Sequence, residues 1–329
     1  MARVVVVGAG VMGLAAAHAL AHAGCEVVVH EQFGPGHAYG SSHGRSRIFR
    51  LAYREPYWVR LAQEALARWR ELEAETGEQL LKLDGLVEIV SNLDQSSAPA
   101  LEECGIAWDR LEAREVERRF ALRVPPGCFC VLQHEAGIVL AERALVGLAR
   151  GIDVRYGTCV TALEELDADC VVVTAGAWVN RLIDQPLAVR ITAETVCYFA
   201  RADARPLPAV ISFHDHTHQF YALPDPQVGV KVGAHHTGTQ VRPGTKAEPD
   251  ARMIQTLCAW AADCLAVADP NPVEAGTCLY TSTVDERFVL ERRGRIVVGS
   301  ACSGHGFKFA PAVGARLAAL ALEVLSESG

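Results

Sequence analysis

Two segments near the C-terminal end of the chain carry residues that could do chemistry on a bound planar ring. Cys278 lies two residues before Tyr280, and a glycine-rich turn at residues 303–307 leads to Lys308. A thiol is a nucleophile once it ionises, and glycines let the backbone come close to a flat group. The simpler interpretation is one more buried cysteine among eleven, followed by a helix-capping loop whose lysine points to water.

A second group of chemistry-bearing residues lies in the apolar segment Gly229–His235, with Tyr221 eight residues before it. Lys231 lies inside this segment between glycines and valines. A lysine is costly to bury unless its ammonium group meets an acid, a water molecule or a cofactor. The simpler interpretation is an edge strand whose lysine reaches solvent.

A third segment, Gly40–Arg50, is rich in hydroxyl groups, glycine and guanidinium groups. It includes Ser41 and Ser42, and it places Arg47 and Arg50 three residues apart beside two apolar residues. Arginine suits anion recognition because it is always charged and binds in a bidentate way. A solvated basic loop is the alternative interpretation.

The elements that must position these residues begin with a dinucleotide-binding unit at the N-terminus. Strand, glycine turn, helix, strand and acid follow in order at residues 3–7, 8–13, 14–22, 25–30 and 31. Gly8 permits the tight turn, Gly10 lets the backbone approach a pyrophosphate, and Gly13 lets helix and strand pack closely. Glu31 can accept hydrogen bonds from ribose hydroxyls. The expected contacts are Gly8, Gly10, Val11, Met12, Gly13 and Glu31. This fingerprint alone does not distinguish FAD from NAD.

Composition excludes several other classes of function. The 329 residues carry a net charge of −8, so no general attraction to nucleic acid or to anionic membranes is expected. No run of eighteen apolar residues suggests a membrane span. The eleven cysteines show no Cys-x-x-Cys pair and no secretory framework, which favours reduced thiols and a cytoplasmic location.

The segment at residues 214–218 reads His-Asp-His-Thr-His and raises the question of a metal site. In an extended strand its three histidines would share one face, where imidazole nitrogens could act as ligands. No partner cysteine or His-Glu-x-x-His pattern accompanies them, and a proline-rich loop adjoins the segment. We therefore expect no metal.

Together these segments resemble the monomeric sarcosine oxidase family. The stretch Gly40–Arg50 looks like the family's Ser-His-His-Gly-x-Thr-Arg-x-x-Arg segment, with Ser46 in place of the usual threonine. The resemblance implies that Arg47 lies against the flavin and that Arg50 binds the substrate carboxylate. By the same resemblance, Lys308 pairs with Arg50 on that carboxylate.

The strand Gly229–His235 is similar to the family's Gly-x-Lys-x-Gly-x-His strand. The resemblance implies that Lys231 lies on the flavin face and promotes oxygen reduction. It places His235 in the substrate pocket together with Tyr221. Ala234 departs from the aromatic residue that often precedes this histidine, a change that could widen the pocket.

Cys278 stands in the family's Cys-x-Tyr-Thr context. The resemblance implies an 8α thioether between this cysteine and the flavin, with Tyr280 beside the flavin in the pocket. The following helix would aim its N–H groups at the flavin and stabilise negative charge there. The turn would add further cofactor contacts from Gly304, Gly306, Phe307 and Lys308.

The expected fold is α/β, with an FAD-binding Rossmann-like domain interleaved with an α+β substrate domain of mixed or antiparallel sheet. The FAD-binding domain is expected at residues 1–81, 126–187 and 284–329. The substrate domain is expected at 82–125 and 188–283, so both domains are discontinuous along the chain.

The resemblance implies an FAD-dependent oxidase of a small secondary amine or amino acid, with O2 as the second substrate, hydrogen peroxide as a product and a monomeric protein. Three alternatives stay open at this point. One is a flavin dehydrogenase that uses another acceptor. A second is an oxidase of cyclic or bulkier amino acids such as proline, pipecolate or N-methyltryptophan. A third is a nucleotide-binding protein without enzymatic activity.

Overall fold

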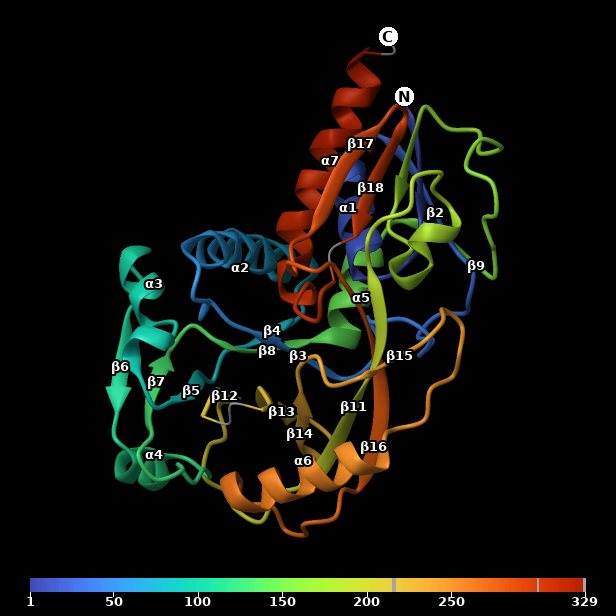
Figure 1. The fold of residues 1–329 in the computed structure, drawn as a ribbon. Helices are drawn as coiled ribbons and strands as arrows, with labels where there is room; N and C mark the ends of the chain where they lie inside the picture. The colour runs from blue at the N-terminus through green and yellow to red at the C-terminus, as the bar shows by residue number, and fades with distance from the viewer. Residues whose placement is uncertain (215–216, 301, 328–329) are drawn as a thin grey trace.

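A six-stranded sheet forms the nucleotide-binding half of the molecule (Figure 1). The computed structural model describes residues 1–214, 217–300 and 302–327. Neighbouring strands are parallel except for the pair β17–β18. The order is β17 (Val289–Arg293), β18 (Ile296–Ser300), β10 (Cys170–Val173), β1 (Arg3–Val7), β2 (Glu26–Glu31) and β9 (Asp153–Tyr156). The β-branched runs of β1 and β10 are buried on both faces, as expected for the centre of a parallel sheet.

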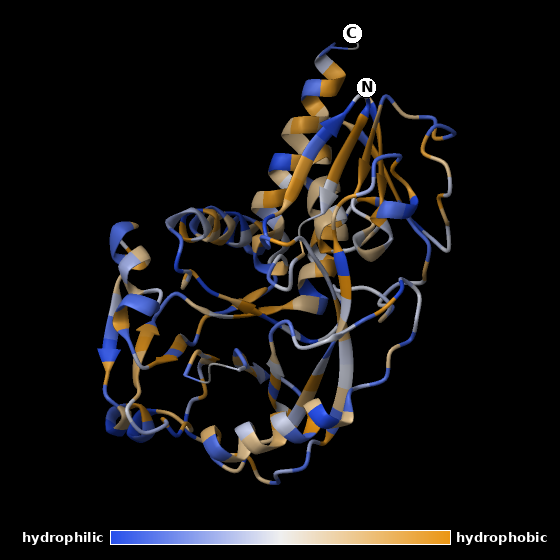
Figure 2. Ribbon diagram, viewed as in Figure 1, coloured by the Kyte–Doolittle hydropathy of each residue, from blue (hydrophilic) through white to orange (hydrophobic). Residues whose placement is uncertain are grey.

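Three helices are associated with this sheet: α1 (Val11–His22), α5 (Ala141–Ala149) and α7 (Ala310–Glu327). Helix α7 packs directly on α1, where a Cβ added at Gly314 would lie 2.5 Å from the backbone of Ala15. Hydrophobic residues fill the strands and the inner faces of these helices (Figure 2). The other face of the sheet is covered by apolar residues of the segment 160–187, which includes η2 (Gly176–Arg181).

One helical stretch among the described residues, Phe307–Glu327, is long and apolar enough to cross a membrane by length and composition alone. Its mean hydropathy is 1.5, and 56% of the tested window is buried inside the protein. The buried face contacts α1 and the strands β10 and β18. These contacts identify the stretch as a core helix of the nucleotide-binding half.

A nine-stranded sheet forms the other half of the molecule. Its order is β15 (Thr239–Gln240), β11 (Arg190–Ala200), β14 (Gly229–Ala234), β13 (Phe220–Asp225), β12 (Ala209–Ser212), β5 (Leu86–Val90), β7 (Phe129–Gln133) and β6 (Trp108–Leu111), with β16 (Glu274–Ser282) paired to β11. Only the pair β5–β12 is parallel, so the sheet is mixed, as the sequence predicts. The face away from the nucleotide-binding half is covered by α6 (Ala251–Cys264) and α4 (Ala113–Arg119).

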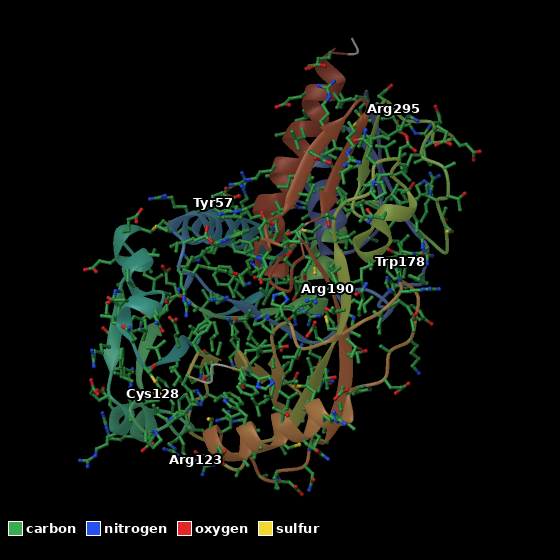
Figure 3. All side chains as sticks on the ribbon, viewed as in Figure 1. Tyr57, Arg123, Cys128, Trp178, Arg190 and Arg295 are labelled. Carbon is green, nitrogen blue, oxygen red and sulfur yellow. The ribbon has the colours of Figure 1, made fainter. Side chains whose placement is uncertain are left out.

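The expected domain boundaries remain a prediction. One strand, β7, is assigned by them to the FAD-binding domain but belongs to the nine-stranded sheet of the other half. The sequence assigns residues 126–187 to the FAD-binding domain, yet β7 pairs with β5 and β6 in the nine-stranded sheet. Apolar residues of β7 complete that sheet, which explains the pairing. Trp178 of η2 and Arg190 at the start of β11 lie near the middle of the molecule, where the two halves meet (Figure 3).

A small third sheet and a long helix join the two halves. The sheet has the order β3 (Ser46–Phe49), β8 (Gly137–Leu140) and β4 (Leu81–Lys82). The helix α2 (Pro56–Thr76) begins with proline, whose missing N–H group is not needed at that position. Its indole at Trp69 donates to the carbonyl of Lys308 over 2.8 Å. The remaining short elements are η1 (Leu93–Gln95), α3 (Ala98–Glu103) and η3 (Phe307–Phe309).

Candidate functional site: a dinucleotide cavity joined to a small polar pocket

A cavity of about 1310 Å³ opens at the carboxyl ends of β1, β2 and β10. Every residue predicted to contact the cofactor lines it, except Gly13. Gly8 has φ of 105°, a conformation that suits glycine, and makes the tight turn into α1. A Cβ at Gly13 would lie 1.9 Å from the carbonyl oxygen of Gly8, so Gly13 acts by letting helix and strand touch. Gly8 therefore serves the turn, and Gly13 serves the packing of the helix against it.

Glu31 lies at the end of β2 and is buried against the glycine turn. Its two carboxylate oxygens accept the N–H groups of Ala9 and Phe33, each over 2.9 Å. Burial opposes charge on this carboxyl, but hydrogen bonds from His37 and these two N–H groups lower its pKa below the ordinary value. Glu31 is therefore an ionised acceptor at the edge of the cavity, with lone pairs left for hydroxyl groups.

Arg47 and Cys278 meet on the cavity wall although 231 residues separate them. Arg47 donates to the carbonyls of Ser46 and Ser41, each over 2.9 Å, and to that of His43. Its Nη2 lies 3.9 Å from the sulfur of Cys278. The strands β3 and β16 bring these two side chains together, so a thiol and a guanidinium group face the same end of the cavity.

The turn before Lys308 lies against the ring of Tyr280. A Cβ at Gly304 would come within 2.2 Å of that ring, and Gly304 has φ of 74°, so no larger residue fits without a shift. The Tyr280 hydroxyl lies 3.2 Å from Nδ1 of His235. Tyr280 lines the large cavity and His235 lines a smaller one, so this pair forms part of the wall between the two.

The smaller cavity has a volume of about 220 Å³ and contains Arg50 and His235. His305 lines both cavities and therefore marks where they adjoin. Arg50 donates to the carbonyl of Ala52, and its guanidinium carbon lies 4.1 Å from the ring centre of Tyr53. A cationic group in a small pocket beside the dinucleotide cavity suits a small anionic ligand.

Lys308 lines the large cavity and contacts the small cavity through a hydrogen bond to Tyr53. Its ammonium group donates to the Tyr53 hydroxyl over 2.9 Å and to the His305 carbonyl over 2.8 Å. The Tyr53 hydroxyl also lies 3.2 Å from Nδ1 of His305. Lys308 lines the large cavity and Arg50 the small one, so Tyr53 links the two cations that the resemblance pairs.

Burial and crowding of positive charge lower the pKa values of the basic groups here. The pKa of His235 falls to about 3, first because it is buried and then because Arg50, His236 and Lys308 repel a further proton. Burial, with the charge of Arg50, holds the pKa of Lys308 well below its ordinary value. An anion bound between these groups would relieve the repulsion.

Lys231 and Tyr221 line neither cavity and lie behind the wall. Lys231 is 4% exposed, and its nitrogen lies 5.9 Å from the ring centre of Tyr198. Burial, followed by the charge of Arg47, lowers its pKa to about 7. Tyr221 packs 5.2 Å from the His235 ring, centre to centre. The predicted roles of both residues remain predictions.

The structure adds residues that the sequence did not assign to the site. Tyr53 lies three residues after Arg50, and that proximity in sequence was the available signal. Positive φ values at His236, Glu286 and Ser303 mark three further positions, all of which line the small cavity. Non-glycine residues adopt this conformation at some energetic cost, and such strain gathers at functional sites. His236 and Glu286 also form an ion pair of 3.2 Å.

The histidine segment considered as a metal site is only partly described. Asp215 and His216 lie outside the described residues, so the expectation of no metal there is not tested. Elsewhere in the described ranges His18, His22 and Glu75 lie close together, and Nε2 of each histidine approaches the Glu75 carboxylate, over 3.1 and 3.5 Å. These contacts join α1 to α2 as a surface hydrogen-bonded cluster.

The residues fit the flavin dinucleotide that the resemblance implies. The cavity exceeds the roughly 300–1,000 Å³ typical of small-molecule sites, as a dinucleotide needs. Gly8 and Gly10 leave the turn free of side chains, and Glu31 stands at the position for a ribose. The N-terminus of α1 faces this turn and favours phosphate.

Comparison with known proteins agrees with this geometry. The profile of a family described as "FAD dependent oxidoreductase" matches residues 3–320. The chain belongs to this family. It is 31% identical to the peroxisomal sarcosine oxidase of Homo sapiens, over 97% of this chain and 92% of that protein. It is also 31% identical to the monomeric sarcosine oxidase of Streptomyces avermitilis, over 97% and 93% of the two chains.

Solved structures give the same result for the fold. The structure of NikD, described as an unusual amino acid oxidase essential for nikkomycin biosynthesis, matches with a TM-score of 0.86 and 27% identity. The match covers 98% of this chain and 95% of NikD. The predicted FAD-binding α/β fold and the resemblance to the sarcosine oxidase family are therefore confirmed. As a family member, the protein is an FAD-dependent oxidoreductase.

Proposed function

We propose that this protein oxidises the C–N bond of a small secondary amine or amino acid to an imine and reduces O2 to hydrogen peroxide. The observation that carries the proposal is the meeting of two cavities at His305, one with the dinucleotide turn and one with Arg50. FAD, when bound, would accept the hydride equivalent that leaves the carbon next to the amine nitrogen, while the nitrogen releases its proton. The similarity to sarcosine oxidases supports an amine as the donor.

The small cavity binds and orients the substrate. Arg50 holds the carboxylate through charge-assisted hydrogen bonds, and the negative charge of that anion favours the protonated form of Lys308. His235 is neutral at physiological pH, and the Tyr280 hydroxyl, 3.2 Å from its Nδ1, fixes the orientation of its ring. In this orientation His235 positions the amine of the substrate. No acid or base of the protein is required, because an unprotonated amine reacts directly. Activity therefore rises with pH toward the pKa of the substrate amine.

We propose that Lys231 assists the reaction with oxygen. Its amine is influenced by the charge of Arg47, which lines the dinucleotide cavity, and a proton gained by Lys231 when the flavin is reduced would favour electron transfer to O2. Lys231→Met should lower the rate of reoxidation by O2 while anaerobic reduction by substrate stays unchanged. Equal reoxidation rates in the two proteins would instead favour a dehydrogenase that uses another acceptor.

We propose a covalent bond between Cys278 and the flavin. Cys278 lines the cavity, and its sulfur lies 3.9 Å from Nη2 of Arg47, which lines the same cavity. Cys302 offers a matched control because it lines the same cavity and lies 3.8 Å from the Ser41 hydroxyl.

Acid precipitation of the purified protein tests the covalent bond. The yellow colour should stay in the pellet for wild type and for Cys302→Ala, and should move to the supernatant for Cys278→Ala. Flavin released from wild type, or retained in Cys278→Ala, would overturn the assignment. A peroxide assay with sarcosine and L-proline on the same preparations tests the oxidase activity itself.

We also propose that the protein is a cytoplasmic monomer. All eleven cysteines lie in the described part of the chain and none of them forms a disulfide there, which is typical of a reducing compartment. Sedimentation or light scattering of the purified protein would give the mass. A mass twice the 35.4 kDa of one chain would contradict the monomer.

A further inference from the structure

A buried carboxyl group stands in the wall of the small cavity and has no role in the reaction described above. Glu88 lies in the middle of β5 and is 2% exposed, yet it lines the cavity that holds Arg50 and His235. Its register neighbours are Val131 of β7 and Ile211 of β12, both buried and apolar. A carboxyl among such neighbours is costly unless its oxygens are hydrogen-bonded.

The direction of the side chain follows from the alternation of the strand. Leu86 and Val90, two residues either side of Glu88, belong to the core that faces the nucleotide-binding half. Val87 and Ile89 belong to the core on the opposite face, under α6. Successive residues of a strand point to opposite faces, so Glu88 points toward the pocket and the nucleotide-binding half.

The hydrogen bonds of Glu88 leave part of its capacity unused. Within the described ranges they all come from Ser97, whose N–H lies 3.1 Å from both oxygens and whose hydroxyl donates to Oε2. A carboxylate accepts about four hydrogen bonds, and Ser97 supplies two donors. Burial raises the pKa of Glu88, while Ser97 and the charges of Arg50 and Arg54 oppose the rise. A ligand in the cavity could therefore use the remaining hydrogen-bonding capacity of Glu88.

We propose that Glu88 determines specificity, and that the substrate is a secondary amino acid whose side chain or ring carries a hydrogen-bond donor such as a hydroxyl group. This rests on the proposed amine oxidation. With the carboxylate of the substrate at Arg50, its side chain shares the cavity with Glu88. The volume of about 220 Å³ is below the roughly 300 Å³ at which drug-sized sites begin, so only a short side chain fits.

The size of the effect follows from the hydrogen bond between the substrate and the buried carboxyl group of Glu88. Leaving such a buried group without its partner costs about 1–3 kcal/mol, which corresponds to roughly 5- to 100-fold in kcat/KM. A pocket built to bind a hydroxyl group rejects the analogue that lacks it, because the buried acceptor then stays unpaired. Ser97 already satisfies part of Glu88, so we expect the lower end of this range.

The experiment compares matched substrate pairs: L-proline with 4-hydroxy-L-proline, and N-methyl-L-alanine with N-methyl-L-serine. Wild type should favour the hydroxyl member of at least one pair by about fivefold or more. Glu88→Leu should abolish that preference. A second readout is independent of turnover: 3-hydroxycyclopentanecarboxylate should bind more tightly than cyclopentanecarboxylate by calorimetry, and Glu88→Leu should equalise them.

Two control variants distinguish recognition of the substrate by Glu88 from a purely structural role of Glu88 in holding Ser97. Glu73 also accepts two backbone N–H groups, over 2.7 and 2.8 Å, but lines neither cavity, so Glu73→Gln should leave both preferences unchanged. If Glu88→Leu fails to fold, Ser97→Ala is the second variant. It keeps the Glu88 carboxyl group but removes the hydroxyl that donates to Oε2, so the preference for the hydroxylated substrate should increase.

The outcomes separate this inference from the proposed function. Oxidation of both members of each pair at ratios that Glu88→Leu leaves unchanged would overturn the role of Glu88 and keep the amine oxidase. If no amine is oxidised, the proposed function fails, and the two carboxylates still decide whether Glu88 recognises a hydroxyl group. Equal binding of those carboxylates to wild type would overturn the inference.

Discussion

Replacing Lys231 with methionine removes a buried ammonium group and leaves a side chain of similar length. The ordinary lysine pKa of 10.5 falls to about 7 here, mainly through burial and then through repulsion by Arg47. Each pKa unit corresponds to about 1.4 kcal/mol. The difference of about 3.5 units therefore sets an upper limit of about 5 kcal/mol on the cost of keeping this lysine charged in the folded protein.

The sign of the effect on stability follows from proton binding. Between pH 7 and 10.5 the unfolded lysine keeps its proton, whereas Lys231 in the folded protein has released it. The unfolded state then binds more protons, so the free energy of unfolding of wild type rises with pH across this window. Lys231→Met lacks this dependence. The variant should be more stable at neutral pH by up to several kcal/mol, with a difference that shrinks as pH rises.

Urea denaturation followed by tryptophan fluorescence at pH 7, 8 and 9 would measure this difference. Both proteins should carry the same amount of bound flavin, because a bound cofactor adds its own contribution to stability. Lys82→Met is the control, since the Lys82 side chain is 52% exposed and no pH-dependent difference is expected. Parallel stability curves for wild type and Lys231→Met would refute the reasoning. A less stable variant at pH 7 would show that the folded protein pairs the Lys231 charge.

Two further predictions concern the cofactor turn and the substrate cation. Gly13→Ala should push α1 away from Gly8, because the new Cβ would lie 1.9 Å from a carbonyl oxygen, and flavin content measured by absorbance should fall sharply. Gly24→Ala is the control: its φ of 83° costs about 1–2 kcal/mol of stability, but nothing lies within 4 Å and flavin should stay bound. Arg50→Gln should raise KM for an amino acid by roughly 10- to 100-fold and leave KM for a simple amine nearly unchanged. Equal effects on both substrates would contradict carboxylate binding by Arg50.

The nucleotide-binding end could be predicted from sequence because its signals are local. The β-branched run of β1, the glycine turn and the acid at Glu31 occupy one continuous βαβ unit. Gly8 has a positive φ and Gly13 lies against the Gly8 carbonyl, whereas the approach of Gly10 to a pyrophosphate stays a prediction. Arg47 and Cys278 could be placed together only through the resemblance. Their meeting depends on β3 and β16, which lie far apart along the chain.

The small cavity was less accessible to prediction because long-range strand pairing builds it. Glu88 lies in the sequence Leu-Val-Glu-Ile-Val, where an acid suggests a solvent-facing position. Its position between β7 and β12, on the face of β5 that Leu86 and Val90 share, directs it toward the pocket. Tyr53 was missed for a similar reason, since its contact with Lys308 joins residues 255 positions apart.

Anaerobic titration of the purified protein with a secondary amino acid tests the central claim most directly. Sarcosine and L-proline are the first substrates, followed by the hydroxylated members of the two pairs. The account predicts that the yellow colour bleaches with one equivalent of a substrate and returns on admission of oxygen, with release of one equivalent of hydrogen peroxide. A protein that binds flavin but is bleached by none of these amines would contradict it.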